Sequence, residues 1–317
     1  MDKTRPIFRS LLDAVRPTTI IEAPRLSERL GASITLASET FQHTGSFKFR
    51  AAYNVALNVS QQHIVTASSG NFGQAMAYAC RMLGKSCTIV MPDKSAKVKI
   101  DAVREFGGIV DLIDVRRTSR ADRVAELAFE FPDAYIASAY DDPLVIEGNA
   151  SLGVEIGSLS REFDLIVAPI GGGGLTSGLI TGLKSSSKPI RVVGAEPLLA
   201  NDAARSLREG RIVTNDQESP TIADGARTVS IGHHNWKILQ KGISRIIEVP
   251  EVRIKEGLQL LFELANLKAE PTGALGVAAL LTAPDFFQAQ SVCCVVSGGN
   301  VDTRVYLNLL DSERVTS

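Results

Sequence analysis

The chain has 317 residues, with 34 Lys and Arg against 35 Asp and Glu, so that its formal net charge is −1. This balance argues against a protein that binds nucleic acid regardless of sequence, because such proteins draw affinity from excess cations placed on phosphates. Hydrophobic residues make up 44% of the chain, an ordinary share for a soluble globular protein. No apolar run approaches the roughly 20 residues of a membrane span. We therefore expect neither nucleic acid nor a membrane as a partner.

Short β-branched runs alternate with longer helical stretches, and this alternation predicts an α/β fold with parallel sheets. The predicted strands are, in chain order, 33–36, 63–66, 87–91, 109–113, 165–170, 191–195 and 291–296. The predicted helices are 48–57, 73–83, 96–106, 121–131, 174–184, 252–267 and 273–281. The polar, turn-rich stretch 209–224 predicts a long surface loop.

The cysteines and the N-terminus indicate the compartment. Cys80, Cys87, Cys293 and Cys294 lie in apolar or helical surroundings, and none belongs to a C-x-x-C pair. We expect buried free thiols in a reducing environment. The N-terminal segment MDKTRPIFRS lacks the apolar core of a secretory signal. The prediction is a cytoplasmic protein.

Four consecutive glycines, Gly171–Gly174, follow an apolar strand and open a helix. Parallel sheets bind ligands at the carboxyl ends of their strands, so this loop stands where a site is expected. Glycines let backbone N–H groups converge at a helix N-terminus, which favours an anion such as phosphate. The loop is not a Walker motif, because no Lys-Ser/Thr follows at the required spacing. A flexible turn is the alternative.

Three further segments carry polar groups at equivalent places. The loop 68–71 offers two hydroxyls, an amide and N–H groups at a helix start, which suits a carboxylate or an ordinary N-cap. Ser297 ends another strand, backed by two glycines, although this loop taken alone favours an ordinary turn. Lys48 opens an apolar helix, where a solvated lysine is the alternative. A phosphate cradle, a carboxylate loop, a lysine and a neutral hydroxyl are the parts that hold pyridoxal phosphate and an amino acid.

From Pro24 to Asp302 the sequence resembles the fold-type II pyridoxal-phosphate enzymes of the threonine/serine dehydratase and serine racemase family. The matching segments, in family order, are TGSFKFR (44–50), SSGNFGQA (68–75), MPDKSAKVK (91–99), YDDPLVIEGN (140–149), PIGGGGLTSG (169–178), EPLLAND (196–202), TIADG (221–225), EPTGALG (270–276) and SGGNVD (297–302). The resemblance implies the tryptophan synthase β-like fold, with two open parallel-sheet α/β domains. Residues 1–62 and 141–317 would form a large cofactor-binding domain, and residues 63–140 a small mobile domain that carries the substrate loop.

The resemblance also implies roles for single residues. Lys48 would form the Schiff base with the cofactor and move the proton at the substrate Cα. Asn71 would face the cofactor's 3-oxygen, and Ser297 its pyridine nitrogen. The implied cofactor-binding residues are Phe47, Lys48, Asn71, Gly171, Gly172, Gly173, Gly174, Leu175 and Ser297. The implied substrate-binding residues are Ser68, Ser69, Gly70 and Asn71, with Ser69 on the face opposite Lys48 as a second catalytic group.

A divalent-cation site is implied at Glu196, the carbonyl of Ala200 and Asp202. Oxygen ligands of this kind suit Mg²⁺ or Ca²⁺, and surface carboxylates at a helix start are the alternative. The chain departs from the family pattern at Ala51, where Gly is usual, at Ala37-Ser38, where a lysine is often seen, and at Phe72, where His is common. Phe72 stands beside the substrate loop, so we expect a more apolar pocket there.

The implied reaction is β-elimination, in which a 3-hydroxy amino acid such as L-threonine or L-serine gives a 2-oxo acid and ammonia. A neutral Ser297 at the pyridine nitrogen favours prompt loss of a β-substituent. Serine racemisation is an alternative, as is dehydration of another 3-hydroxy amino acid such as 3-hydroxyaspartate or phenylserine. A non-catalytic amino-acid-binding protein on the same scaffold is a distant alternative. The expected partners are a small amino-acid substrate and a second copy of the chain in a homodimer.

Overall fold

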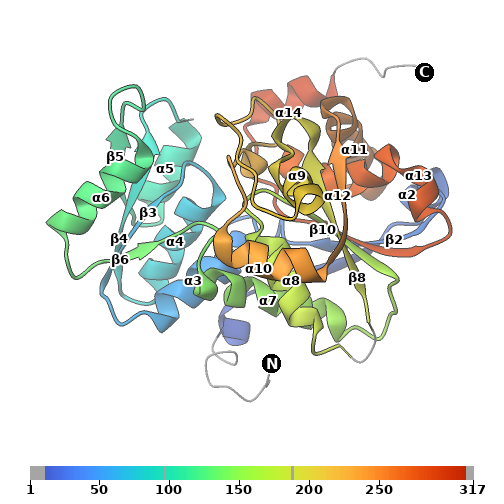
Figure 1. Cartoon of the computed structure of the whole chain (residues 1–317), viewed down its shortest axis with the longest axis horizontal. Coiled ribbons are helices and arrows are strands. Elements are labelled where there is room, and N and C mark those ends of the chain that lie inside the picture. The colour runs from blue at the N-terminus through green and yellow to red at the C-terminus, as the bar shows by residue number, and fades with distance from the viewer. Residues whose placement is uncertain (1–10, 96, 187–188, 312–317) are drawn as a thin grey trace.

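The computed structural model describes residues 11–95, 97–186 and 189–311. Ala96, where one predicted helix begins, lies outside the described residues. The described chain forms two α/β units side by side (Figure 1). Together with the comparisons reported below, the two largely parallel sheets confirm the predicted fold class.

The larger sheet has six strands in the order β1-β2-β10-β7-β8-β9. Their bounds are β1 Thr19–Glu22, β2 Ser33–Ser38, β7 Leu165–Pro169, β8 Arg191–Pro197, β9 Ile243–Val249 and β10 Ser291–Val296. All neighbours are parallel except β1 and β2, which are antiparallel. Every residue of β7 is buried, as expected of a strand covered by helices on both faces.

The smaller sheet has four parallel strands in the order β5-β4-β3-β6. Their bounds are β3 His63–Ala67, β4 Ser86–Pro92, β5 Ile109–Ile113 and β6 Tyr135–Ala137. Two ion pairs join this unit to the larger one: Lys99 with Asp224, and Arg120 with Glu218.

The α-helices are α2 Pro24–Leu30, α3 Lys48–Asn58, α4 Asn71–Met82, α5 Lys97–Glu105, α6 Arg120–Glu130, α7 Pro143–Gly157, α8 Gly174–Leu183, α9 Asp202–Glu209, α10 His233–Gly242, α11 Glu251–Ala265, α12 Pro271–Thr282, α13 Pro284–Phe287 and α14 Thr303–Leu310. Short 3₁₀ turns cover Leu198–Ala200 and Asp224–Ala226. Each strand and helix predicted from the sequence is present, with its ends shifted by at most two residues. No helix in the described part of the chain combines the length and apolarity needed to cross a membrane.

Helix α7 was not predicted, and its glycines explain why. Glycine disfavours a helix interior, and α7 contains Gly148 and Gly153. Both face neighbouring backbone: a Cβ at Gly148 would stand 2.6 Å from the carbonyl oxygen of Arg50, and one at Gly153 would stand 2.7 Å from that of Leu179. The glycines therefore let α7 pack closely against α3 and α8.

The predicted surface loop 209–224 is confirmed over residues 210–220, which contain no helix or strand and are mostly exposed. Its two ends need a correction. Glu209 ends α9, and Thr221 and Ala223 are fully buried. The hydroxyl of Thr221 donates to the Glu251 carboxylate at 2.6 Å, and the N–H of Ile222 donates to the same group at 2.7 Å. Polar composition suggested a surface position for Thr221, but its side chain is buried and its hydroxyl is paired with the Glu251 carboxylate.

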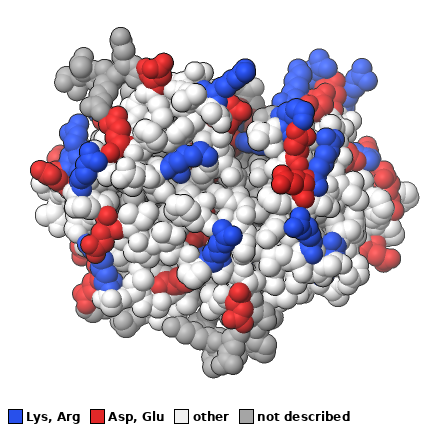
Figure 2. Space-filling model, turned by 180° about the vertical axis from the view of Figure 1, so that it is seen from behind, with Lys and Arg blue, Asp and Glu red and all other residues white. Residues whose placement is uncertain are grey.

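The four cysteines are buried and free, as predicted. On the face shown in Figure 2, charges of both signs are interspersed and leave a wide uncharged area between them. That surface agrees with the near-zero net charge of the chain.

Candidate active site

The loops after β7 and β10 lie at the same edge of the larger sheet, because the two strands are parallel neighbours. The segment before α3 is tied to the second loop. Ser46 pairs with Gly298 in an isolated bridge, and the N–H of Phe47 donates to the Ser297 carbonyl at 3.0 Å. The structure thereby brings Lys48 to the strand ends that carry the glycine loop and Ser297.

Lys48 is the first residue of α3, and its amine lies inside the protein. The Nζ atom donates to the carbonyl of Ala139 at 2.7 Å and lies 5.1 Å and 5.6 Å from the ring centroids of Phe47 and Phe72. Burial lowers the pKa of Lys48 to about 8, although the negative charge of Glu270 opposes the shift. A much larger fraction of this amine is neutral at pH 7 than of an exposed lysine, and the neutral amine is the nucleophile.

The glycine loop offers N–H groups without protein partners. Within the described residues, the N–H groups of Gly171, Gly172 and Gly173 donate to no protein acceptor. Gly173 has a φ of +92°, a left-handed conformation that favours glycine. Helix α8 begins at Gly174, so that its dipole adds positive potential at the loop. The arrangement fits a phosphate group.

Ser297 supplies a second orphaned group. Its side chain is 1% exposed, and its Oγ has no hydrogen-bond partner among the described residues. A buried hydroxyl without a partner carries an energetic cost that a ligand atom would remove. The Ser297 hydroxyl fits the pyridine nitrogen of pyridoxal phosphate. The glycine loop fits its phosphate, and the Lys48 amine fits its carbonyl.

Asn71 is held by two residues that sequence reasoning did not assign to the site. Its Nδ2 donates to Glu270 Oε1 at 2.8 Å, and its Oδ1 accepts from Asn300 Nδ2 at 2.8 Å. Burial raises the pKa of Glu270 to about 8, and Asp224 adds to the rise. Both residues stand in motifs that carried the resemblance, and their polarity beside glycines was the available signal. The two bonds fix which end of the Asn71 amide faces each neighbour.

The two serines of the predicted substrate loop, residues 68–71, differ in their hydrogen bonds. The Oγ of Ser68 accepts the N–H groups of Gly70 at 3.3 Å and Gly73 at 3.1 Å, and so caps the start of α4. The side chain of Ser69 is half-buried and makes no hydrogen bond to the described residues. The Ser69 hydroxyl is therefore available to a ligand.

Phe72 belongs to the hydrophobic core as well as to the surroundings of Lys48. Its ring is 1% exposed and packs in the hydrophobic cluster that joins α3 to the smaller unit, and the Lys48 amine lies over the ring. Successive residues of a helix point about 100° apart, so Asn71 and Phe72 face different neighbours.

The predicted cation ligands gather at the start of α9. The Glu196 carboxylate accepts the N–H groups of Ala203 at 2.9 Å and Ala204 at 2.8 Å. Burial raises the pKa of Glu196 well above its usual value, and Asp202 contributes. Burial also raises the pKa of Asp202 to about 7. Ala200 lies in the 3₁₀ turn just before. The set contains two carboxylates, and no group of three or more His, Cys, Asp or Glu side chains in the described residues could hold a metal.

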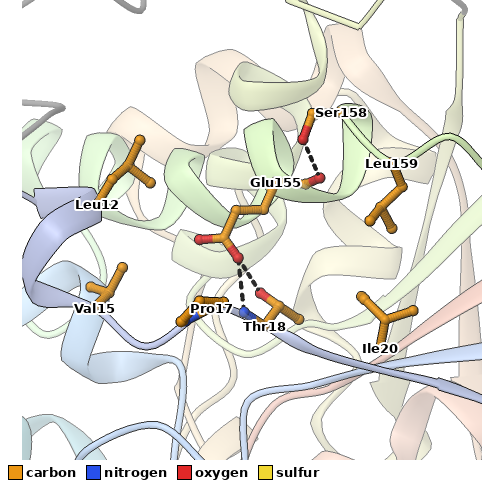
Figure 3. A pocket seen from close by; sticks show the side chains of 8 residues that line it. All are labelled: Leu12, Val15, Pro17, Thr18, Ile20, Glu155, Ser158 and Leu159. Atoms are coloured by element: carbon orange, nitrogen blue, oxygen red, sulfur yellow. Dashed lines mark hydrogen bonds between the residues drawn. The ribbon is translucent and has the colours of Figure 1, made fainter.

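A pocket of about 350 Å³ lies elsewhere, lined by Leu12, Val15, Pro17, Thr18, Ile20, Glu155, Ser158 and Leu159 (Figure 3). None of these is a predicted site residue. Its only charged lining group, Glu155, is already engaged: the carboxylate accepts the Thr18 N–H at 2.9 Å and hydroxyl at 2.7 Å and pairs with Arg50 at 2.8 Å. We therefore place the site at the strand ends and not in this pocket.

Comparisons with known proteins support pyridoxal phosphate as the cofactor. The family model described as "Pyridoxal-phosphate dependent enzyme" matches residues 11–298. The chain is 33% identical to an L-threo-3-hydroxyaspartate ammonia-lyase of Pseudomonas sp., with 92% of each chain covered. It is also 33% identical to a serine racemase of Arabidopsis thaliana, with 92% of this chain and 91% of the relative covered. The crystal structure of a T.th. threonine deaminase superposes with a TM-score of 0.88 and 36% identity, over 93% of this chain and 96% of that one.

Proposed function

Because this chain belongs to the family of pyridoxal-phosphate dependent enzymes, we propose that it converts a 3-hydroxy amino acid to a 2-oxo acid and ammonia by β-elimination. The observation that carries the proposal is the buried Lys48 amine of lowered pKa. The same sheet edge carries the Ser297 hydroxyl and the glycine loop, whose N–H groups, like that hydroxyl, have no hydrogen-bond partner among the described residues. Relatives named as ammonia-lyases of hydroxyaspartate and threonine support this reaction class.

Each part of the proposed site has a separate role in this reaction. Pyridoxal phosphate, when bound, supplies the electron sink that stabilises negative charge at Cα. Lys48 would hold it through its amine and would take the proton from the substrate Cα. The N–H groups of Gly171–Gly174 would bind the phosphate, and the Ser297 hydroxyl would face the pyridine nitrogen. The loop of Ser69 and Asn71 binds the substrate carboxylate. Closure of the smaller unit, residues 63–140, excludes water from the site.

A substrate panel tests the proposal. The purified enzyme is given L- and D-forms of serine, threonine, 3-hydroxyaspartate and phenylserine, and release of the 2-oxo acid and ammonia is followed. The enantiomers of the remaining substrate are separated in parallel. Release from at least one L-substrate, absent in a Lys48→Ala control, supports β-elimination. Binding of these amino acids without release of a 2-oxo acid would contradict it.

Serine racemisation is the second candidate, and the free hydroxyl of Ser69 favours it. If Ser69 moves the proton on the face opposite Lys48, Ser69→Gly should suppress racemisation and elimination from the D-substrate. Elimination from the L-substrate should survive through Lys48. The measurement is kcat/KM for both enantiomers of serine, together with the rate of interconversion.

Ser119→Gly is the control for Ser69→Gly, because Ser119 caps α6 by accepting the N–H of Asp122 at 3.0 Å and lies outside the site. Replacing a serine cap by glycine costs only a few tenths of a kcal/mol, so both enantiomers should react as before. Equal losses for L- and D-serine in Ser69→Gly would instead mean that Ser69 only binds the carboxylate.

We expect the apoenzyme to capture pyridoxal phosphate faster as pH rises, with a midpoint near the lowered Lys48 pKa of about 8. Only the neutral amine attacks the aldehyde, and an exposed lysine would give a midpoint near 10.4. The folded state loses this proton near pH 8 while the unfolded chain keeps it, so the apoenzyme should also gain stability as pH rises above 8. Stopped-flow absorbance across this range measures the first effect, and a midpoint near 10 would contradict the assignment.

We propose further that Glu196, Asp202 and the carbonyl of Ala200 bind Mg²⁺ or Ca²⁺. The Oδ2 atom of Asp202 is buried and has no partner among the described residues, so a cation would supply one. After treatment with a chelator, added Mg²⁺ or Ca²⁺ should raise the melting temperature, because binding to the native state alone stabilises it. Glu196→Ala with Asp202→Ala should erase the gain. An unchanged melting temperature in the parent protein would contradict the site.

A homodimer and a cytoplasmic location stay predictions from the sequence. Sedimentation velocity of the purified enzyme would decide the first, and a dimer that persists at low protein concentration would support it.

A further inference from the structure

The segment that returns from the smaller sheet, residues 138–142, passes directly over the cofactor site. The carbonyl of Ala139 accepts the hydrogen bond of Lys48 at 2.7 Å. The ring of Tyr140 lies so close to Gly172 that a Cβ there would collide with it, and a Cβ at Gly174 would stand 3.0 Å from the Tyr140 carbonyl. This return segment therefore contacts both the amine and the glycine loop.

Asn235 of α10 joins the return segment to the glycine loop. Its side chain is fully buried, and its Nδ2 donates to the carbonyl of Tyr140 at 2.9 Å and to that of Gly172 at 2.8 Å. A side-chain amide has two N–H donors, so both are used on carbonyls far apart in the sequence. A Cβ added at Gly173 would stand 3.0 Å from the Cβ of Asn235. The amide is thus packed directly against the loop that it holds.

Helix α10 is itself fixed to the same segment, which makes Asn235 a rigid support. The carboxylate of Asp141 accepts the N–H groups of His233 at 2.9 Å and His234 at 2.8 Å. The N–H of Gly232 donates to the Gly172 carbonyl at 3.1 Å. The start of α10, the return segment and the glycine loop therefore form one hydrogen-bonded unit.

The bond to Gly172 determines where the next N–H points. In a planar trans peptide the carbonyl of Gly172 and the N–H of Gly173 point in opposite directions. With the carbonyl held by the Asn235 side chain and the Gly232 N–H, the N–H of Gly173 is turned away from α10. Four glycines in a row would otherwise sample many conformations, and a loop fixed in its binding conformation gains affinity.

We propose that Asn235 is a positioning residue for the cofactor phosphate: it fixes the Gly172 peptide so that the glycine loop is ordered before the phosphate binds. The inference rests on the proposed function only for the identity of the cofactor. It assigns Asn235 no contact with the substrate.

The test compares two aldehydes that differ only in the phosphate. Apoenzyme is titrated with pyridoxal 5'-phosphate and with pyridoxal, and binding is followed by the fluorescence of Trp236, the single tryptophan of the chain, and by imine absorbance. In Asn235→Leu, which keeps the size and removes both donors, affinity for pyridoxal phosphate should fall about tenfold, the equivalent of one to two hydrogen bonds. Affinity for pyridoxal should change less than twofold.

Two further variants separate positioning from a general loss of stability. Asn235→Ser retains one donor and should lose less affinity for pyridoxal phosphate than Asn235→Leu. Asn54→Leu removes another fully buried amide, which donates to the carbonyl of Leu144 at 2.8 Å, and should bind both aldehydes as the parent does. Equal losses for the two aldehydes in Asn235→Leu, or no loss for either, would overturn the proposal. Because no substrate is present, the result is independent of the reaction that the enzyme catalyses.

Discussion

Lys48→Ala is expected to abolish turnover and covalent attachment of the cofactor while the chain still folds. Loss of the group that moves the Cα proton should lower kcat/KM by at least about 10³-fold. The fold should survive because, among the described residues, the Lys48 amine makes a single hydrogen bond, to the carbonyl of Ala139, and its removal relieves the cost of burying a charge. The measurements are 2-oxo acid release, imine absorbance and circular dichroism.

Lys85→Ala is the matched control for this variant. The Lys85 amine also donates to a backbone carbonyl, that of Val59 at 2.5 Å, but it lies outside the site. Turnover should stay close to that of the parent enzyme. Borohydride treatment followed by peptide mapping should find the cofactor on Lys48 in the parent and in Lys85→Ala. Attachment to a different lysine in Lys48→Ala, with turnover retained, would contradict the assignment of Lys48.

Sequence reasoning could find the parts of the site that break an ordinary pattern. Four glycines between a strand and a helix, and a hydroxyl at a strand end, stand out from apolar surroundings, and the structure places Gly171–Gly174 and Ser297 at one sheet edge. Asn235 could not be found in this way. It lies within an amphipathic helix, where one more polar residue gives no signal, and its role depends on partners 63 and 95 residues away.

The limits on the fold prediction have a similar cause. Strand β6 has three residues, and β1 alternates half-buried with exposed positions at the edge of its sheet, so neither forms a recognisable apolar run. Helix α7 was hidden because its glycines, which disfavour helix locally, are required by close packing against α3 and α8. Contacts with distant parts of the chain stabilise these elements, and such contacts cannot be recognised in a local sequence pattern.

A second large effect is expected at Arg50, two residues after Lys48 on α3. Its guanidinium is fully buried and pairs with Glu39 at 2.7 Å and Glu155 at 2.8 Å, and it donates to the Thr18 hydroxyl at 2.9 Å. Burial alone would lower the pKa of Arg50, but the two carboxylates raise it. Arg50 therefore stays charged and joins the start of β1, the end of β2 and helix α7 to α3, the helix that begins at Lys48.

Arg50→Met should lower the free energy of unfolding by about 3–5 kcal/mol, because it leaves the buried Glu39 carboxylate and the half-buried Glu155 carboxylate without their cation. Adding Glu39→Gln and Glu155→Gln should recover a large part of the loss, since the remaining groups are then neutral and can pair with one another.

Arg123→Met is the control: Arg123 pairs with Asp111, Glu126 and Glu130 at the surface of the smaller unit, where such pairs contribute about 1 kcal/mol or less. Urea unfolding measures all three variants. A loss in Arg50→Met no larger than that in Arg123→Met would show that the buried network does not hold α3 in place. A triple variant as unstable as Arg50→Met would show that the loss comes from the missing side-chain volume and not from the stranded charges.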